Sequence, residues 1–258
     1  AGKGVEFLLK PDFGKVDRNV FLNALGQSFY SMSIGMGCIC TYASYFSRQT
    51  NLFKSALQIS VIDLLVAVLA GLMIFPAAFS VGISPDSGPS LIFITLPNVF
   101  NKAFAALPVL GWIISLLFYV LLSVAALTSL MSLHEVNTSF FYEELKIDRK
   151  KGAWIVTISC AVIGAFCSFS LGATDKLSWF GKTLFDWFDF ITGQVFLPMA
   201  GLLTCLFLGW YVPKKILKDE FTNWGTLKGR LFGIYFFLIK FVCPILILLV
   251  FLNQFEVL

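Results

Sequence analysis

The chain has 258 residues, a mean hydropathy of +0.84, 58% apolar residues and only 13% charged residues. An ordinary soluble domain carries about 25% charged residues, and one compact soluble domain could not bury this much apolar surface. The composition therefore excludes a soluble globule and favours a membrane protein. The net charge of +4 is modest and indicates no nucleic-acid partner.

Six apolar stretches are long enough to cross a lipid bilayer, which takes about 20 helical residues. The expected spans are Val20–Ser47, Leu57–Ser80, Leu107–Tyr142, Ala153–Leu171, Phe180–Val212 and Leu231–Leu252. Residues 1–19 then form an N-terminal segment outside the membrane, and residues 20–258 form one transmembrane domain. No segment alternates with the two-residue period of a barrel strand, so the predicted fold class is an all-α membrane protein.

The distribution of basic residues predicts which loops face inward. If the N-terminus lies outside, more Lys and Arg residues fall in the inner loops than in the outer segments, so we expect both chain ends outside. The outer loop 81–106 contains a short apolar stretch, Leu91–Phe100, with Pro89 before it and Pro97 within it. This stretch is too short to span a bilayer and is predicted to fold back as a lid or re-entrant element.

The first span has an unusual centre. Ser31 and Ser33 are followed by Gly35 and Gly37, and each glycine costs about 1 kcal/mol inside a helix. We expect this helix to be broken at mid-span, because unwound backbone in transporters exposes carbonyl and amide groups that bind a cation and a carboxylate. Close helix packing through small residues is the alternative.

Polar residues at membrane depth identify further candidate ligands. Asp63 lies in the second span, where an ionisable side chain costs at least about 2.5–3.5 kcal/mol on insertion scales. It is predicted to be a monovalent-cation ligand or a proton carrier; a hydrogen bond to a neighbouring helix is the alternative. In the third span, Ala125, Thr128 and Ser129 offer neutral oxygens that suit an alkali cation, unless the hydroxyls bond to their own helix.

The remaining polar residues indicate a gate rather than an enzyme. Asp186 and Asp189 are spaced i,i+3 near the outer edge of the fifth span, where they either form a gate charge or are solvated at the interface. His134 and Glu135 lack the rest of a zinc-protease motif and are expected to face the bundle interior as a polar pair. No catalytic motif occurs, so we expect no enzyme; an intramembrane aspartyl protease is the one enzymatic alternative.

The run Ala24–Gly37, followed by Thr41–Tyr45, resembles the sixth transmembrane helix of the neurotransmitter:sodium symporter family, bacterial amino-acid branch. The resemblance continues through Ala70–Ala78, Gly88–Pro89, Phe93–Pro97, Ala126–Ser129 and Glu143–Leu145. It implies a leucine-transporter-type fold in which this chain supplies helices six to eleven, the second inverted repeat plus one helix. It also implies that the first half of the same transporter is a partner missing from this chain.

The resemblance assigns roles to individual residues. Tyr30 resembles the aromatic residue that closes over the substrate, and Asp189 the carboxylate of the same outer gate. Tyr45 and Glu143 resemble the inner gate, although the family commonly has Asp at the second position. The substrate-binding residues implied are Tyr30, Ser31, Ser33, Gly35, Met36, Ser129 and Leu133.

Two sodium sites are implied, each completed by the missing first half. Ser31 and Asp63 resemble ligands of the first site, and Ala125, Thr128 and Ser129 resemble those of the second. Many members have a neutral Asn where Asp63 stands, so a fixed negative charge here implies chloride-independent transport. Sodium is the only cofactor implied, with no organic cofactor.

The expected function is sodium-coupled symport of an amino acid by alternating access across the plasma membrane. Met36 stands where some relatives have Phe, and its deformable side chain implies room for a hydrophobic or aromatic substrate. The alternative from another class is a non-transporting membrane scaffold or sensor with the same fold. Both readings make the lipid bilayer a partner.

Overall fold

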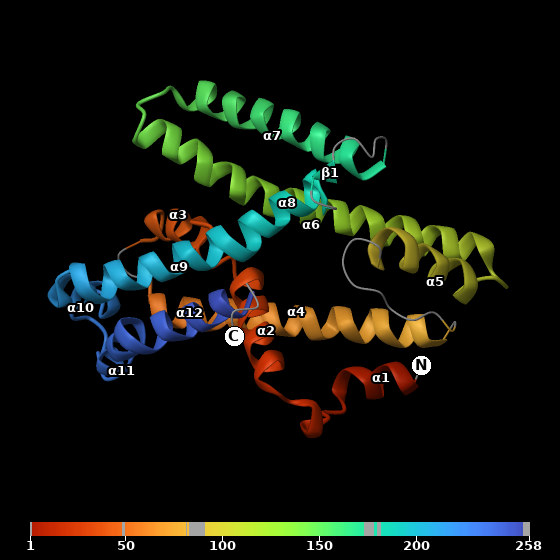
Figure 1. Cartoon of the computed structure of the whole chain (residues 1–258), viewed down its shortest axis with the longest axis horizontal. Helices are drawn as coiled ribbons and strands as arrows, with labels where there is room; N and C mark the ends of the chain where they lie inside the picture. Colours follow the sequence, from red (N-terminus) through yellow and green to blue (C-terminus); the bar gives the residue numbers. More distant parts are fainter. Residues whose placement is uncertain are drawn as a thin grey trace. The chain divides into compact units, whose positions relative to one another are not determined.

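The computed structural model describes residues 2–47, 50–80, 82, 91–172, 178–179 and 182–254 (Figure 1). The chain divides into two compact units, which are described separately. Unit 1 comprises Ala1–Val16 and Gln58–Leu130, and unit 2 comprises Asp17–Leu57 and Met131–Leu258. The helices α4 (Leu52–Ser80) and α6 (Pro108–Glu143) each contribute residues to both units.

Unit 1 is built on α4 and the first part of α6. The short helix α1 (Gly2–Leu9) packs along α4, and a single 3-10 turn, η1 (Phe13–Lys15), follows it. A Cβ atom at Gly4 would lie 2.5 Å from the backbone nitrogen of Pro76, so only glycine allows this approach. The ring of Phe7 lies 5.3 Å from that of Phe75, which extends the same contact.

The described part of the predicted lid also belongs to unit 1. It consists of the π-helical turn η2 (Leu91–Thr95) and the helix α5 (Leu96–Ala103). The phenol of Tyr119 on α6 donates a hydrogen bond of 2.7 Å to the carbonyl oxygen of Ile92, and the rings of Phe100 and Phe118 lie 5.5 Å apart. These contacts hold the lid helix against α6; Gly88 and Pro89 lie outside the described residues.

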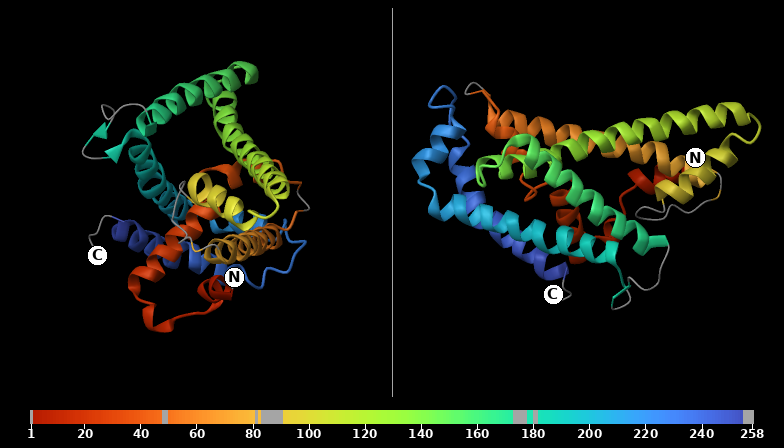
Figure 2. Two further views of the ribbon diagram at one scale, coloured as in Figure 1. Left: turned by 90° about the vertical axis from the view of Figure 1, so that its right-hand side faces the viewer. Right: turned by 90° about the horizontal axis from the view of Figure 1, so that it is seen from above.

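Unit 2 contains most of the remaining helices (Figure 2). In chain order they are α2 (Arg18–Ser31), α3 (Cys38–Ser44), the end of α6, α7 (Arg149–Gly172), α8 (Leu184–Asp189), η4 (Phe190–Phe196), α9 (Leu197–Leu206), η5 (Phe207–Tyr211), α10 (Lys214–Phe221), α11 (Phe232–Phe237), η6 (Leu238–Val242) and α12 (Cys243–Gln254). The strands β1 (Ser178–Trp179) and β2 (Lys182–Thr183) pair antiparallel over two residues each. Helix α12 packs against α9 and α2, and Leu22, Leu197 and Ile247 are buried there.

Five helical runs have the length and composition to cross a membrane. They are Leu52–Ser80, Pro108–Glu143, Arg149–Ser170, Leu184–Tyr211 and Phe232–Asn253. Their most apolar windows are only 6–17% buried, so most of this apolar surface is free to face lipid. The predicted helical fold class is confirmed, and these runs lie close to the second to sixth expected spans; the count of six crossings stays a prediction.

Candidate functional site

The expected first span is not one continuous helix. Asp17 caps the start of α2 by accepting a hydrogen bond of 2.8 Å from the amide of Val20. Helix α2 then ends at Ser31, and α3 begins only at Cys38. Neither helix alone, at 14 and 7 residues, is long enough to cross a bilayer.

The backbone between α2 and α3 adopts left-handed conformations. The φ angles of Ser33, Gly35 and Gly37 are +52°, +88° and +81°. Glycine adopts such angles without strain, whereas a left-handed Ser costs roughly 1–2 kcal/mol. Among the described residues, the carbonyl oxygens of Ile34 and Gly35 accept no backbone hydrogen bond, so both are available to a ligand.

This unwound segment packs against the start of α9. A Cβ atom at Gly35 would lie 2.5 Å from the carbonyl oxygen of Leu197, and one at Gly201 would lie 3.3 Å from the ring of Phe29. The ring of Tyr30 comes within 4.0 Å of the position that a Cβ would take at Gly193, one turn beyond Asp189. The structure thus brings Tyr30 to the helical run Leu184–Tyr211, which also carries Asp189, and both side chains are exposed.

The two aspartates of the fifth span behave differently. The carboxylate of Asp186 accepts hydrogen bonds of 3.0 and 2.7 Å from the amide and hydroxyl of Thr183, and its own amide donates to that hydroxyl. This reciprocal arrangement is a capping box at the start of α8. Asp186 therefore caps the start of α8, whereas Asp189 ends α8 with an exposed side chain.

The candidate sodium ligands are divided between the two units. Asp63 is half-buried on α4 in unit 1, and Ser31 belongs to unit 2. On α6, the hydroxyl of Thr128 donates a hydrogen bond of 2.7 Å to the carbonyl oxygen of Ala125. That bond is the one expected if the hydroxyl bonds to its own helix. Ser129 is exposed one residue further along.

The substrate-pocket candidates are likewise divided. Ser129 lies in unit 1, whereas Leu133, one turn later on α6, lies in unit 2 with Tyr30, Ser33, Gly35 and Met36. Within the described residues, no cluster of three His, Cys, Asp or Glu side chains is arranged to hold a metal ion. The oxygen-rich candidates fit an alkali cation better than a transition metal.

A polar network joins α3, α6 and the start of α7 in unit 2. The phenol of Tyr45 donates a hydrogen bond of 2.9 Å to Oε1 of Glu135, and the guanidinium of Arg149 donates to the same oxygen. A second bond of 2.8 Å runs from the phenol of Tyr42 to the hydroxyl of Ser132. Tyr45 thus meets Glu135, and Glu143, two helical turns further along α6, forms no ion pair among the described residues.

His134 and Glu135 form hydrogen bonds with different neighbours. Nε2 of His134 lies 3.2 Å from the carbonyl oxygen of Ala153 and 3.0 Å from the hydroxyl of Thr157 on α7. Because Thr157 donates its own hydrogen to Ala153, Nε2 carries the imidazole hydrogen, and Nδ1 accepts from Thr138. His134 therefore joins α6 to α7. Neighbouring helical residues point about 100° apart, which sends Glu135 to α3 instead.

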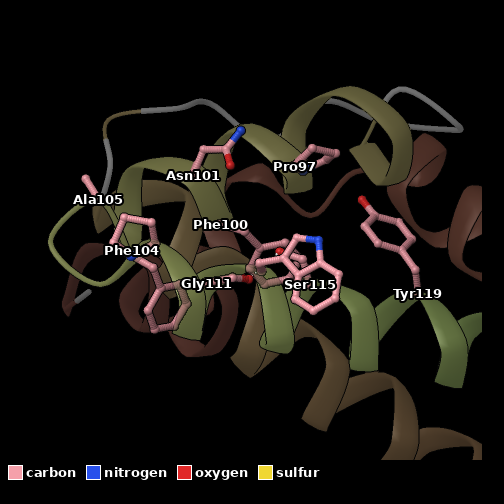
Figure 3. Close-up of a pocket in the computed structure, with 10 residues that line it drawn as sticks. Pro97, Phe100, Asn101, Phe104, Ala105, Gly111, Ser115 and Tyr119 are labelled. Carbon is pink, nitrogen blue, oxygen red and sulfur yellow. Dashed lines mark hydrogen bonds between the residues drawn. The ribbon is translucent and has the colours of Figure 1, made fainter.

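Unit 1 also contains a cavity of about 500 Å³ between α5 and the first part of α6 (Figure 3). Aromatic side chains, including Phe100, Phe104 and Tyr119, form much of its wall, with Asn101 and Ser115 as polar members. None of the residues assigned to substrate, sodium or gates lines this cavity.

Comparison with known proteins agrees with this architecture. The model of the sodium:neurotransmitter symporter family matches residues 1–258. The chain is 37% identical to the sodium-dependent transporter YhdH of Bacillus subtilis over 98% of its own length and 55% of that protein. A sodium-dependent transporter of Haemophilus influenzae is 34% identical over 98% of this chain and 54% of the relative. The chain therefore spans about half the length of these relatives.

A solved structure supports the same relationship. The crystal structure of MhsT in complex with L-phenylalanine superimposes with a TM-score of 0.85 at 36% identity, over 98% of this chain and 56% of that one. With its long apolar helices, the chain is a multi-pass membrane protein. The chain belongs to the sodium:neurotransmitter symporter family.

Proposed function

We propose that this chain supplies helices six to eleven of a sodium-coupled amino-acid symporter that works by alternating access. The observation that carries this proposal is the unwound segment between Ser31 and Cys38, packed on α9 through Gly35. A break of this kind gives a transporter carbonyl oxygens for a cation and amides for a carboxylate near the middle of the membrane. Relatives named as sodium-dependent transporters support the coupling ion.

The substrate proposed is a hydrophobic or aromatic amino acid. The solved relative is in complex with L-phenylalanine, and relatives from Drosophila are named sodium-dependent nutrient amino acid transporters. Ser33, Gly35, Met36 and Leu133, all in unit 2, are proposed to surround the substrate side chain, with Ser129. Tyr30 is proposed to cover the substrate, with Ser31 beneath it.

Two sodium sites are proposed, each completed by the first half of the transporter. Ser31 and Asp63 contribute to one site, and Ala125, Thr128 and Ser129 to the other. Asp63 supplies a fixed negative charge beside the first sodium, so transport needs no chloride. Sodium binding before the substrate completes the carboxylate site and raises substrate affinity.

The gates and the orientation are proposed from the same assignment. Tyr30 and Asp189 form the outer gate, and Tyr45 and Glu143 belong to the inner gate, where Tyr45 and Arg149 both donate hydrogen bonds to Glu135. The transporter lies in a plasma membrane, with residues 1–19 and the C-terminus on the outer side. The membrane potential then contributes about 2.3 kcal/mol per sodium charge per 100 mV.

Equilibrium binding tests the proposed coupling directly. Radiolabelled phenylalanine is bound to the purified transporter, assembled from this chain and the family's first half, while sodium is replaced by potassium. We expect saturable binding in sodium that falls at least tenfold in potassium. Ser31→Ala, at the end of α2, should weaken the sodium dependence, whereas Ser123→Ala, on α6, should leave it unchanged. Equal binding in both salts would favour a scaffold or sensor.

A further inference from the structure

Lys240 is a cation placed inside a membrane-crossing helix. It lies eight residues after Phe232, where the span Phe232–Asn253 begins, or about 12 Å along the helix. Its ammonium group lies 4.5 Å from the ring centroid of Trp210 and 5.8 Å from that of Phe236. Trp210 is the last residue but one of the span Leu184–Tyr211. Phe236 lies one helical turn before Lys240, closer to the start of the span Phe232–Asn253. The lysine therefore extends toward the membrane surface, as long basic side chains do at helix ends.

Trp210 and Phe236 form an aromatic cage around the Lys240 ammonium group. Close packing of the neighbouring helical segments η5 and η6 in unit 2 fixes this cage. A Cβ atom at Gly209 would lie 2.9 Å from Cα of Lys240, so glycine is needed for this approach. The indole nitrogen of Trp210 donates a hydrogen bond of 3.3 Å to the carbonyl oxygen of Lys240. The position of the Lys240 backbone is thereby tied to that of Trp210.

A second ammonium group meets the same cage. Lys214, the first residue of α10, places its ammonium group 5.0 Å from the centroid of the Phe236 ring. Neither Lys214 nor Lys240 forms an ion pair with a carboxylate in the part of the chain that the structure describes. Two like charges near one ring repel each other, and an anion between them would remove that cost.

The surroundings suit a lipid. Trp210 is 63% exposed and Tyr211 is 79% exposed, at the point where the span ends. Aromatic residues in this position pack against the glycerol and upper acyl region of a bilayer. The helix α10 that follows also holds Lys215 and Lys218, which add positive charge at the same surface.

We propose that Lys214 and Lys240 bind the phosphate group of an anionic phospholipid, with Trp210 and Tyr211 against its glycerol and acyl part. Cation–π contacts hold the two ammonium groups in place, while the phosphate supplies the counter-charge that the described protein residues do not. The site is separate from the residues proposed for sodium and substrate. A result that excludes this lipid site would therefore leave the proposed symport intact.

Native mass spectrometry tests this site without a transport assay. The assembled transporter in detergent is mixed with equal amounts of dioleoyl phosphatidylglycerol and dioleoyl phosphatidylcholine, and the ratio of retained lipids is measured. We expect the wild type to prefer the anionic lipid. Each of Lys214→Gln and Lys240→Gln should lower that preference roughly fivefold, and the double variant about 25-fold.

Matched variants separate the site from net charge and from misfolding. Lys3→Gln with Lys102→Gln removes the same charge from unit 1 and should keep the wild-type preference. Lys240→Arg should also keep it, and Lys214→Gln changes an exposed side chain that does not hold the fold together. An unchanged preference in the Lys214→Gln variant would overturn the proposal. Displacement of the lipid by millimolar inorganic phosphate would overturn it too, because a free-anion site would then be present.

Discussion

The phenol of Tyr45 and the carboxylate of Glu135 join α3 to α6 by a hydrogen bond of 2.9 Å, and Arg149 donates to the same carboxylate oxygen. The Glu135 side chain is only 24% exposed, so the bond is stronger than a surface contact of the same length. The bond holds α3, the helix that follows the unwound segment, against α6. A substitution at Glu135 should therefore change how firmly α3 is held against α6.

We expect Glu135→Gln to destabilise the assembled transporter by about 1–3 kcal/mol, because Arg149 loses its ionised partner. Thermal unfolding in detergent measures the effect. Glu143→Gln is the matched control and should leave the melting temperature unchanged, since Glu143 is exposed and forms no ion pair among the described residues. Equal melting of the two variants would show that the Glu135 network contributes nothing to stability.

Gly35→Ala should abolish substrate binding or folding. The new Cβ would lie 2.5 Å from the carbonyl oxygen of Leu197, and alanine is strained at a φ of +88°. Gly233→Ala has open space around it on α11 and should leave the protein as stable as the wild type or slightly more so. The Gly35→Ala and Gly233→Ala variants are compared by size-exclusion chromatography and by phenylalanine binding. Wild-type binding by the Gly35→Ala protein would contradict the packing of the unwound segment.

Asp63→Asn should change the ion dependence of uptake. Removing the fixed negative charge weakens the first sodium site, and a mobile anion can then restore it, so we expect lower sodium affinity and stimulation by chloride. Uptake is measured in sodium gluconate and in sodium chloride. If both wild type and variant ignore chloride, the Asp63 carboxylate is not the group that makes chloride unnecessary.

Tyr119→Phe should loosen the lid helix. The variant removes the 2.7 Å hydrogen bond to the Ile92 carbonyl oxygen, which is worth about 1 kcal/mol. Hydrogen exchange over Leu91–Ala103 should rise roughly fivefold. Tyr211→Phe, at a phenol 79% exposed, should leave exchange in this segment unchanged. Unchanged exchange in the Tyr119→Phe protein would show that the lid is held by apolar packing alone.

The apolar stretches of the sequence predicted the long helices, because a helix that faces lipid needs an unbroken run of apolar residues. The interruption near Gly35 was also visible, since glycines are costly in a helix and useful at positive φ. The partner of Tyr45 was not predicted. The pairing of Tyr45 with Glu135 depends on how α3 packs against α6, and sequence spacing does not encode that packing.

A signal for this network did exist in the sequence. Glu135 is a charge eight residues before the end of α6, and Arg149 begins the next helix, so a short connection places the two near each other. The capping role of Asp186 had a signal as well, because Thr183 precedes it by three residues at a helix start.

Uptake into proteoliposomes tests the central claim most directly. The assembled transporter is reconstituted, and entry of radiolabelled phenylalanine is measured with an inward sodium gradient and then with potassium or choline in its place. We predict concentrative uptake that requires sodium, persists when gluconate replaces chloride, and is lost in the Asp63→Ala variant. Uptake that proceeds equally without sodium, or no sodium-dependent uptake of any hydrophobic or aromatic amino acid, would contradict the proposed symport.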